Sequence, residues 1–203
     1  MRRDTAIRRL RLIAEQCGQV SRIRPVLCSA YVFGELLPDG VPEVEVVQVA
    51  FVLDLPAEQL TWCAEPPECG WLVELLELGK APVLWYWRPS AWPVANHVIR
   101  RPLRFWSAAA GIDEQALDAL ASGQAETLRP PERPAAGQAQ LTVELAASLA
   151  HLRHTEAGYW ERDWRAAHRG AGTYPEQHLW NAVHGYLDLL TATDHQHPHA
   201  DTN

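Results

Sequence analysis

Residues 31–56 read YVFGELLPDGVPEVEVVQVAFVLDLP, and this stretch decides the fold of the chain. Two apolar runs rich in Val, Phe and Tyr, Val26–Leu37 and Val44–Leu55, flank the turn segment Pro38–Pro42. β-branched and aromatic residues favour a packed, pleated surface, whereas Pro, Asp and Gly favour turns. The stretch therefore predicts a strand, a turn and a second strand.

The composition is that of a globular protein with a substantial core. The chain has 203 residues, 47% of them hydrophobic, and it is rich in tryptophan, with nine residues of this type. No apolar run approaches the roughly 18 residues that would cross a membrane, and residues 1–17 lack the apolar core of a signal peptide. We therefore expect a cytoplasmic protein with reduced thiols at Cys17, Cys28, Cys63 and Cys69. The spacing of Cys63 and Cys69 fits no standard zinc site.

Charge is segregated along the chain. Residues 25–77 contain ten acidic residues and no Lys or Arg, whereas residues 78–112 contain five basic residues and no acid. Such blocks either pair inside the fold or make a polarised surface. With a net charge of −7, the chain is expected to bind a protein partner or a second copy of itself, with a nucleotide as an alternative ligand. Nucleic acid and membranes are not expected as partners.

Outside the central unit, apolar periodicity and breakers predict the remaining elements. Helices are predicted over 4–17, Pro56–Cys63, Glu68–Leu78 and Asp113–Ala121, with Gly18 ending the first. Val83–Trp87 is a predicted strand, and residues 94–106 hold a further strand that lies at an edge or breaks at Pro102, which cannot donate a ladder hydrogen bond.

The C-terminal part predicts a helical hairpin made by Gln140–Arg169 and Tyr174–Ala192, with Thr173 capping the second helix. Residues 123–138 are rich in Pro and Gly and have no periodicity. We therefore divide the chain into an α/β domain (1–110), a short helix and connection (111–138), the hairpin (139–193) and a polar, His-rich tail (194–203).

One set of residues carries a resemblance to a known fold. Gly34 is followed, after the turn, by Glu43 and Glu45. This layout resembles the nucleotidyltransferase fold, in which a helix precedes a strand ending in Gly-Ser and the next strand carries Asp-x-Asp. The resemblance implies an α/β (α+β) fold with a small mixed sheet flanked by helices, here followed by the helical hairpin. It also implies that Glu43 and Glu45, on one face of a strand, hold Mg²⁺.

The motif departs from the nucleotidyltransferase pattern in two ways. Glu35 stands where Ser would contact phosphate, and no Asp or Glu lies between Glu77 and Asp113 to supply the third acid of that family. The sequence therefore favours a non-catalytic binding or interaction module, a pseudoenzyme without a cofactor. The alternative is an active, Mg²⁺-dependent nucleotidyltransferase that uses Glu43 and Glu45. The structural reading is that both glutamates lie on a solvated strand face and that Gly34 marks a bulge.

A second set of residues lies in the acid-free basic stretch. Arg100, Arg101 and Arg104 alternate there with aromatic residues, a pattern that can stack bases and hold phosphate. Together with Gly34 and Glu35, these arginines form the predicted nucleotide or phosphate site. The alternative is a Trp-rich core whose arginines pair internally.

Three weaker patterns remain. Arg162 and His168 resemble the Arg/His pair of helical RNase domains, and His195, His197 and His199 alternate in the tail as adventitious or metal-binding histidines. The segments VFGE…VQVA…DLP and LWNAVHGYLDLL (Leu179–Leu190) are similar to those of an uncharacterised bacterial domain family. That resemblance covers most of the chain and implies that Glu35 belongs to the pattern.

Overall fold

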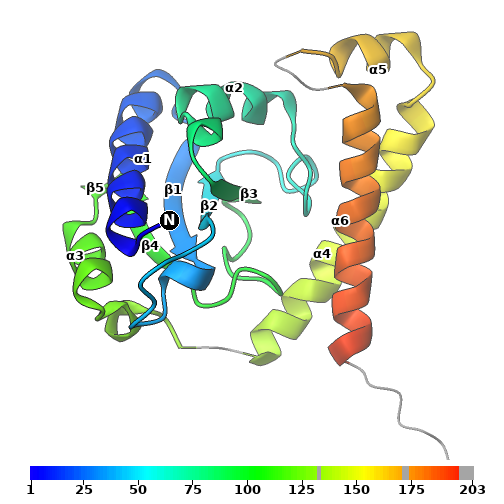
Figure 1. Ribbon diagram of the computed structural model, residues 1–203. Helices are drawn as coiled ribbons and strands as arrows, with labels where there is room; N and C mark the ends of the chain where they lie inside the picture. Colours follow the sequence, from blue (N-terminus) through cyan, green and yellow to red (C-terminus); the bar gives the residue numbers. More distant parts are fainter. Residues whose placement is uncertain (132–133, 171–173, 197–203) are drawn as a thin grey trace, which may run out of the picture.

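The structure is a computed structural model that describes residues 1–131, 134–170 and 174–196. In this part of the chain, strands β1 (Leu27–Phe33), β2 (Val47–Leu53), β3 (Val83–Pro89), β4 (Leu103–Ser107) and β5 (Gly111–Ile112) form one sheet. Their order is β3-β2-β1-β4-β5 (Figure 1). β1 is antiparallel to both neighbours, whereas β2 and β3 run parallel. The predicted class, a mixed sheet flanked by helices, is confirmed.

The predicted strand–turn–strand unit forms the centre of the sheet, and both strands are shorter than expected. Val32 of β1 pairs with Val49 of β2 in an antiparallel register. β1 ends at Phe33 because Gly34, at φ +71°, begins a short 3-10 helix, η1 (Gly34–Leu36). A Cβ on Gly34 would lie 1.5 Å from Oε1 of Gln48, so glycine is required at this turn rather than at a bulge within the strand.

Helix α1 (Arg3–Ile23) packs on the sheet and runs past its predicted end at Gly18. Val20 continues the buried face beyond this glycine. Its burial offsets the roughly 1 kcal/mol that glycine costs in a helix interior relative to alanine. Helix α3 (Glu114–Ser122) packs beside α1 and is capped by Asp113, whose Oδ1 accepts from the Ala116 N–H at 3.0 Å. The buried residues of α1 are Ala6, Leu10, Ile13, Ala14, Cys17 and Val20.

The segment after β2 departs from prediction. The expected helix over Pro56–Cys63 is wrong: the chain forms turns there. Leu60, Thr61 and Trp62 are buried in succession, and a surface helix cannot bury three consecutive side chains on one face. Cys63 then adopts a left-handed conformation with φ +62°. Helix α2 (Pro67–Leu75) and the 3-10 helix η2 (Leu78–Lys80) follow, near the predicted range.

The two later strands agree with the breaker residues. β3 contains the predicted strand over Val83–Trp87 and lies at one edge of the sheet. β4 starts directly after Pro102 and lies between β1 and β5, so the predicted break at this proline is confirmed. A short 3-10 helix, η3 (Ala125–Leu128), precedes the connection to the C-terminal helices.

The C-terminal hairpin is confirmed, although its first helix is interrupted. Helices α4 (Pro134–Gly158) and α6 (Pro175–Gln196) lie antiparallel, side by side (Figure 1). The predicted single helix to Arg169 instead ends at Gly158, and α5 (Arg162–Ala167) is a separate short helix. A Cβ on Gly158 would lie 2.7 Å from the indole of Trp164, which packs against this turn. The predicted cap Thr173 lies outside the described residues.

None of the described helices is both long enough and apolar enough to cross a membrane.

Candidate functional site

The predicted metal-binding pair does not lie on a strand. Glu43 and Glu45 are in the loop before β2, and both side chains are exposed. This loop pairs with the N-terminus instead: the Arg3 N–H donates to the Pro42 carbonyl oxygen at 2.9 Å, and the Val44 N–H donates to that of Met1 at 2.9 Å. The expectation that strand geometry aligns the two carboxylates is therefore wrong.

Glu35 lies close to this loop through a local hydrogen bond. Its Oε2 accepts from the backbone N–H of Glu45 at 3.0 Å, and its own N–H donates to Oε1 of Gln48 at 3.2 Å. Glu35 thus braces the turn after Gly34. Across the described ranges, no three His, Cys, Asp or Glu side chains are grouped so that they could hold a metal ion.

The predicted phosphate-binding arginines are only partly free. Arg101 pairs with Glu126 at 2.5 Å and donates from Nε to the Pro130 carbonyl oxygen at 2.9 Å. Arg100 is exposed and donates from Nε to the His97 carbonyl oxygen at 3.2 Å. Arg104, also exposed, pairs opposite Tyr31 in the β1–β4 register. Of the three, Arg101 thus has its guanidinium engaged by Glu126 and Pro130.

A different site lies between β3 and α6. It is a cleft of about 400 Å³ that is open to solvent, and aromatic rings, two carboxylates and one thiol contribute to its walls. Four parts of the chain meet there: the segment between β2 and α2, strand β3, the loop between β3 and β4, and helix α6. The lining residues are Trp62, Cys63, Ala64, Glu65, Leu84, Trp85, Tyr86, Trp87, Val98, Asn181, His184 and Asp188.

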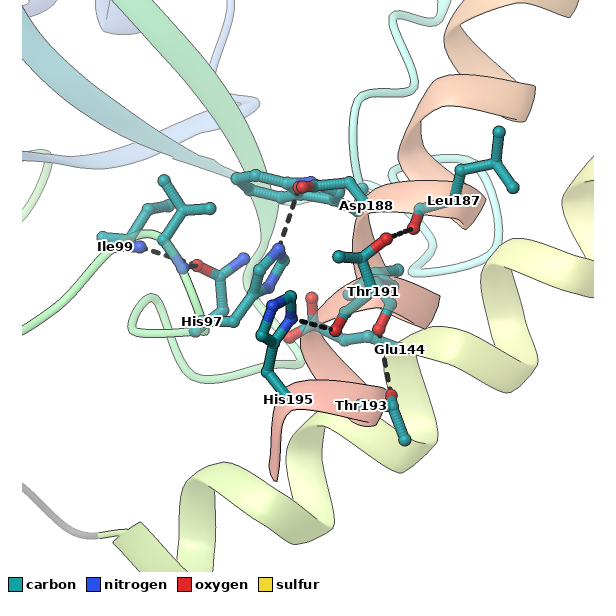
Figure 2. Close-up of polar contacts among 12 residues, drawn as sticks. His97, Ile99, Glu144, Leu187, Asp188, Thr191, Thr193 and His195 are labelled. Atoms are coloured by element: carbon teal, nitrogen blue, oxygen red, sulfur yellow. Dashed lines mark hydrogen bonds and ion pairs between the residues drawn. The ribbon is translucent and has the colours of Figure 1, made fainter. Parts of the chain in front are cut away.

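Asp188 connects α6 to the sheet side of the cleft. Its Oδ2 accepts from the Trp62 indole N–H at 2.6 Å and lies 2.9 Å from Nε2 of His97 (Figure 2). Burial opposes ionisation of this carboxyl, but the contacts with His97 and Trp62 outweigh it and lower the pKa of Asp188. Trp62 also stacks on Tyr86, with ring centroids 4.7 Å apart. The carboxylate is therefore held in one position at the cleft.

The backbone of Trp62 and Cys63 lies directly against α6. A Cβ on Gly185 would lie 2.0 Å from the Trp62 carbonyl oxygen, so only glycine permits this approach. The left-handed conformation of Cys63 is of a kind that costs about 1–3 kcal/mol in a non-glycine residue. Strain of this kind persists only where surrounding contacts enforce it, and here α6 supplies one of those contacts.

The surroundings of the thiol in the cleft disfavour its thiolate form. Burial raises the pKa of Cys63 to about 12, and the nearby Asp188 and Glu65 carboxylates add to the shift. At neutral pH the thiol is therefore protonated, whereas nucleophilic cysteines are thiolates. Burial also raises the pKa of Glu65. The indole N–H groups of Trp87 and Trp85 instead lower the pKa of Glu65. Trp87 Nε1 nevertheless makes no hydrogen bond with a described residue.

A buried ion pair joins β3 to α4 next to the cleft. Arg88 donates from Nη1 and Nη2 to the two oxygens of Glu144 at 2.8 and 2.5 Å, and their side chains are 0% and 1% exposed. Nη2 also donates to the Pro93 carbonyl oxygen at 2.9 Å, and Gln140 donates to Glu144 at 3.0 Å. Arg88, from the stretch expected to meet phosphate, is thus paired internally.

The remaining predicted patterns concern residues of α5, α6 and the tail. Arg162 is exposed at the start of α5, whereas His168, beyond its end, stacks on Trp164 at 3.8 Å between ring centroids. His195 lies in α6, where Nδ1 is 2.7 Å from the Thr191 carbonyl oxygen. His197 and His199 lie outside the described residues.

Sequence reasoning missed Asp188 and Glu65 as functional candidates, and it considered His97 only as part of the basic, aromatic stretch. One signal pointed to Asp188: it lies within LWNAVHGYLDLL, the segment that resembles an uncharacterised domain family. Each of these residues has an ordinary local context, and only the tertiary structure brings them together.

A family model described as "Domain of unknown function (DUF7711)" matches residues 1–195 of the chain. Neither the curated proteins nor the solved structures contain a match.

Proposed function

The chain belongs to the DUF7711 family, and we propose that it is a non-catalytic binding module whose ligand enters the cleft between β3 and α6. The observation that carries this proposal is the position of Asp188, held by Trp62 and His97 at a cleft with aromatic walls. A concave, mostly apolar site with a few fixed polar groups is the usual form of a ligand-binding pocket.

Two features favour binding over catalysis at this cleft. The pKa of the Cys63 thiol is raised to about 12, which favours the protonated form over an activated thiolate nucleophile. Asp188 is already committed to two contacts with the protein, which suit a fixed recognition group better than a proton carrier. The cleft thus offers ring surfaces and hydrogen-bond acceptors for recognition.

The scaffold that supports this cleft is proposed to be nucleotidyltransferase-like. In support, α1 precedes β1, Gly34 follows the end of β1, and β2 is paired antiparallel with β1 and parallel with β3. The family that this layout resembles uses its sheet to present carboxylates to metal. In this protein the proposed site is the aromatic cleft at the β3 edge of the sheet rather than a set of metal-binding carboxylates. The protein would then be a pseudoenzyme.

An active Mg²⁺-dependent nucleotidyltransferase that uses Glu43 and Glu45 is the second candidate. One observation favours it: an open hollow of about 380 Å³ lies beside Glu43 and includes Arg2, Arg3 and Asp4. Much of the Arg3 guanidinium is committed, because it donates to the carbonyl oxygens of Leu120 and Pro38. Of the two arginines there, Arg2 is the better placed to meet a phosphate.

We place this module in the cytoplasm of a bacterium, with a protein partner as the source of its ligand. The location rests on the four cysteines, all of which are free thiols. The bacterial source rests on the sequence resemblance, and the partner on the charge segregation of the chain.

The test is a ligand screen on the full chain, read by ¹H–¹⁵N NMR of the tryptophan indole N–H groups. Binding in the cleft shifts the resonances of Trp62, Trp85 and Trp87, and Asp188→Ala weakens it by removing the acceptor of the Trp62 indole. A screen in which hits shift only indoles far from the cleft, such as Trp160, contradicts the proposal.

A separate assay addresses the second candidate. The full chain is incubated with Mg²⁺ and α-labelled ATP, GTP or CTP, alone and with cell protein or RNA. Transfer of label that is lost in Glu45→Gln would establish the nucleotidyltransferase and overturn the non-catalytic proposal. Absence of transfer with all three nucleotides is the expected result.

A further inference from the structure

Resting on the proposed function, we infer that the ligand of the cleft presents an organic cation, an ammonium or guanidinium group, which binds beside Cys63 between Glu65 and Asp188. The inference names the chemical class that the cleft recognises. It differs from the nucleotide or phosphate that the basic stretch of the sequence predicts.

The charge of the lining residues is the first argument. Glu65 and Asp188 both line the cleft, and no Lys or Arg is among the lining residues. Arg88, the basic residue that lies on β3, is buried and faces Glu144 instead. A phosphate would therefore meet two carboxylates without a compensating cation, whereas an ammonium or guanidinium group would meet complementary charge.

The state of Glu65 is the second argument. Its carboxylate is partly buried, and it makes no ion pair with any described residue. Removing a carboxylate from water without a cationic partner is costly. Asp188, the other acid, pairs with His97, whereas the groups that lower the pKa of Glu65 are the neutral indoles of Trp87 and Trp85, so Glu65 is the carboxylate that a ligand cation would satisfy.

The geometry around Cys63 is the third argument. Both carboxylates act on its sulfur: the pKa of Cys63 rises through burial and further through Asp188 and Glu65. Cys63, Glu65 and Asp188 all line the same cleft, so a cation that enters beside Cys63 meets negative charge from both acids.

The aromatic walls are the fourth argument. Tyr86 and Trp85 are both half-buried, so part of each ring faces the cleft. Cations are attracted to the faces of such rings, and more strongly when water is excluded. A cation–π contact also occurs elsewhere in the protein, where the Arg24 guanidinium lies 5.1 Å from the ring centroid of Trp71.

The experiment compares three soluble probes on the full chain: N-acetyl-arginine amide, its neutral isostere N-acetyl-citrulline amide, and AMP. Dissociation constants are measured from the indole resonances of Trp62, Trp85 and Trp87. We expect the arginine probe to bind at least about tenfold more tightly than citrulline, and we expect AMP not to bind in the cleft. Binding of citrulline or AMP as tightly as arginine overturns the inference and leaves the proposed function standing.

Variants assign the effect to the cleft. Glu65→Gln is expected to weaken the arginine probe about tenfold, whereas Glu74→Gln, an exposed acid on α2 outside the cleft, leaves it unchanged. If Glu65→Gln fails to fold, Leu84→Lys serves instead, because Leu84 is 39% exposed and lines the cleft. The added ammonium group should repel the probe. Unchanged affinity in the folded variant overturns the inference.

The source of the cation is distinguished by a fourth probe, acetyl-Gly-Arg-Gly-amide. Tighter binding of this peptide than of the single residue points to an arginine carried by a partner protein, and equal binding points to a free small molecule. Absence of binding by every cationic probe contradicts the inference, while cleft hits of another class in the ligand screen would preserve the proposed function.

Discussion

Gly185 of α6 lies so close to Trp62 that a Cβ at position 185 would be 2.0 Å from the Trp62 carbonyl oxygen. This contact joins residues far apart in the sequence and brings the C-terminal hairpin against the turn after β2. It also explains why Cys63, the next residue, is held in a left-handed conformation. The shape of the cleft therefore depends on a backbone contact at one glycine.

Gly185→Ala is expected to destabilise the protein by about 1–3 kcal/mol, because either α6 or the Trp62 backbone must move. The measurement is urea unfolding followed by far-UV circular dichroism. Gly137→Ala is the matched control: Gly137 is also helical, but its Cβ would meet no atom within 4 Å. That substitution should be neutral or stabilise by up to about 1 kcal/mol. Equal effects of the two substitutions would refute the contact.

The ion pair between Arg88 and Glu144 predicts strong coupling. Replacing Glu144 with Leu leaves a buried guanidinium without its carboxylate and should cost about 3–5 kcal/mol. Arg88→Met combined with Glu144→Leu removes both charges and is expected to regain most of that loss. A double-mutant cycle from chemical unfolding gives the coupling free energy, and additive single substitutions would contradict a buried pair.

Asp188 predicts a dependence of stability on pH. Its pKa in the folded protein is lowered, so its contribution is complete above the ordinary value of 3.8 and is lost as the pH falls through the folded value. The difference in unfolding free energy between the wild type and Asp188→Asn should therefore shrink below about pH 3.8. Urea unfolding at pH 3, 5 and 7 measures it. A difference that grows towards low pH would be inconsistent with the His97 and Trp62 contacts.

Cys63 predicts a change in thiol reactivity. Because burial, Asp188 and Glu65 all raise its pKa, to about 12, Glu65→Gln should lower this pKa and increase the thiolate fraction at a given alkaline pH. The rate of iodoacetamide modification at Cys63, resolved by peptide mass from pH 8 to 10, should rise in this variant. Glu74→Gln provides the control. An unchanged rate in Glu65→Gln would show that Glu65 does not raise the pKa of the Cys63 thiol.

Much of the fold could be predicted from local patterns, and the exceptions have physical causes. Turn residues predict the two central strands, and the missing N–H of Pro102 predicts the break there. Apolar periodicity predicts the helical hairpin. The helix expected at Pro56–Cys63 was wrong because tertiary burial of Trp62 overrides local preference. Glu43 and Glu45 were expected on a strand. Their segment instead forms a loop that pairs with residues 1–3, and no local signal in the sequence indicates this pairing.

The candidate cleft could not be predicted in the same way. Trp62 and Asp188 are 126 positions apart, and Arg88 and Glu144 are 56 apart. No periodicity connects such residues, because their proximity follows from how the hairpin packs on the sheet edge. The basic stretch was interpreted from its composition, whereas the partner of Arg88 is supplied by α4.

The contact between Asp188 and Trp62 can form only late in the synthesis of the chain, because the ribosome makes the Trp62 segment first. β3 and the Trp62 turn are synthesised long before residue 188 of the 203-residue polypeptide. Until that aspartate emerges, the Trp62 indole has no acceptor from α6, and the cleft lacks the wall that α6 supplies. Any chain that stops before Asp188 would therefore leave the Trp62 indole without this hydrogen bond.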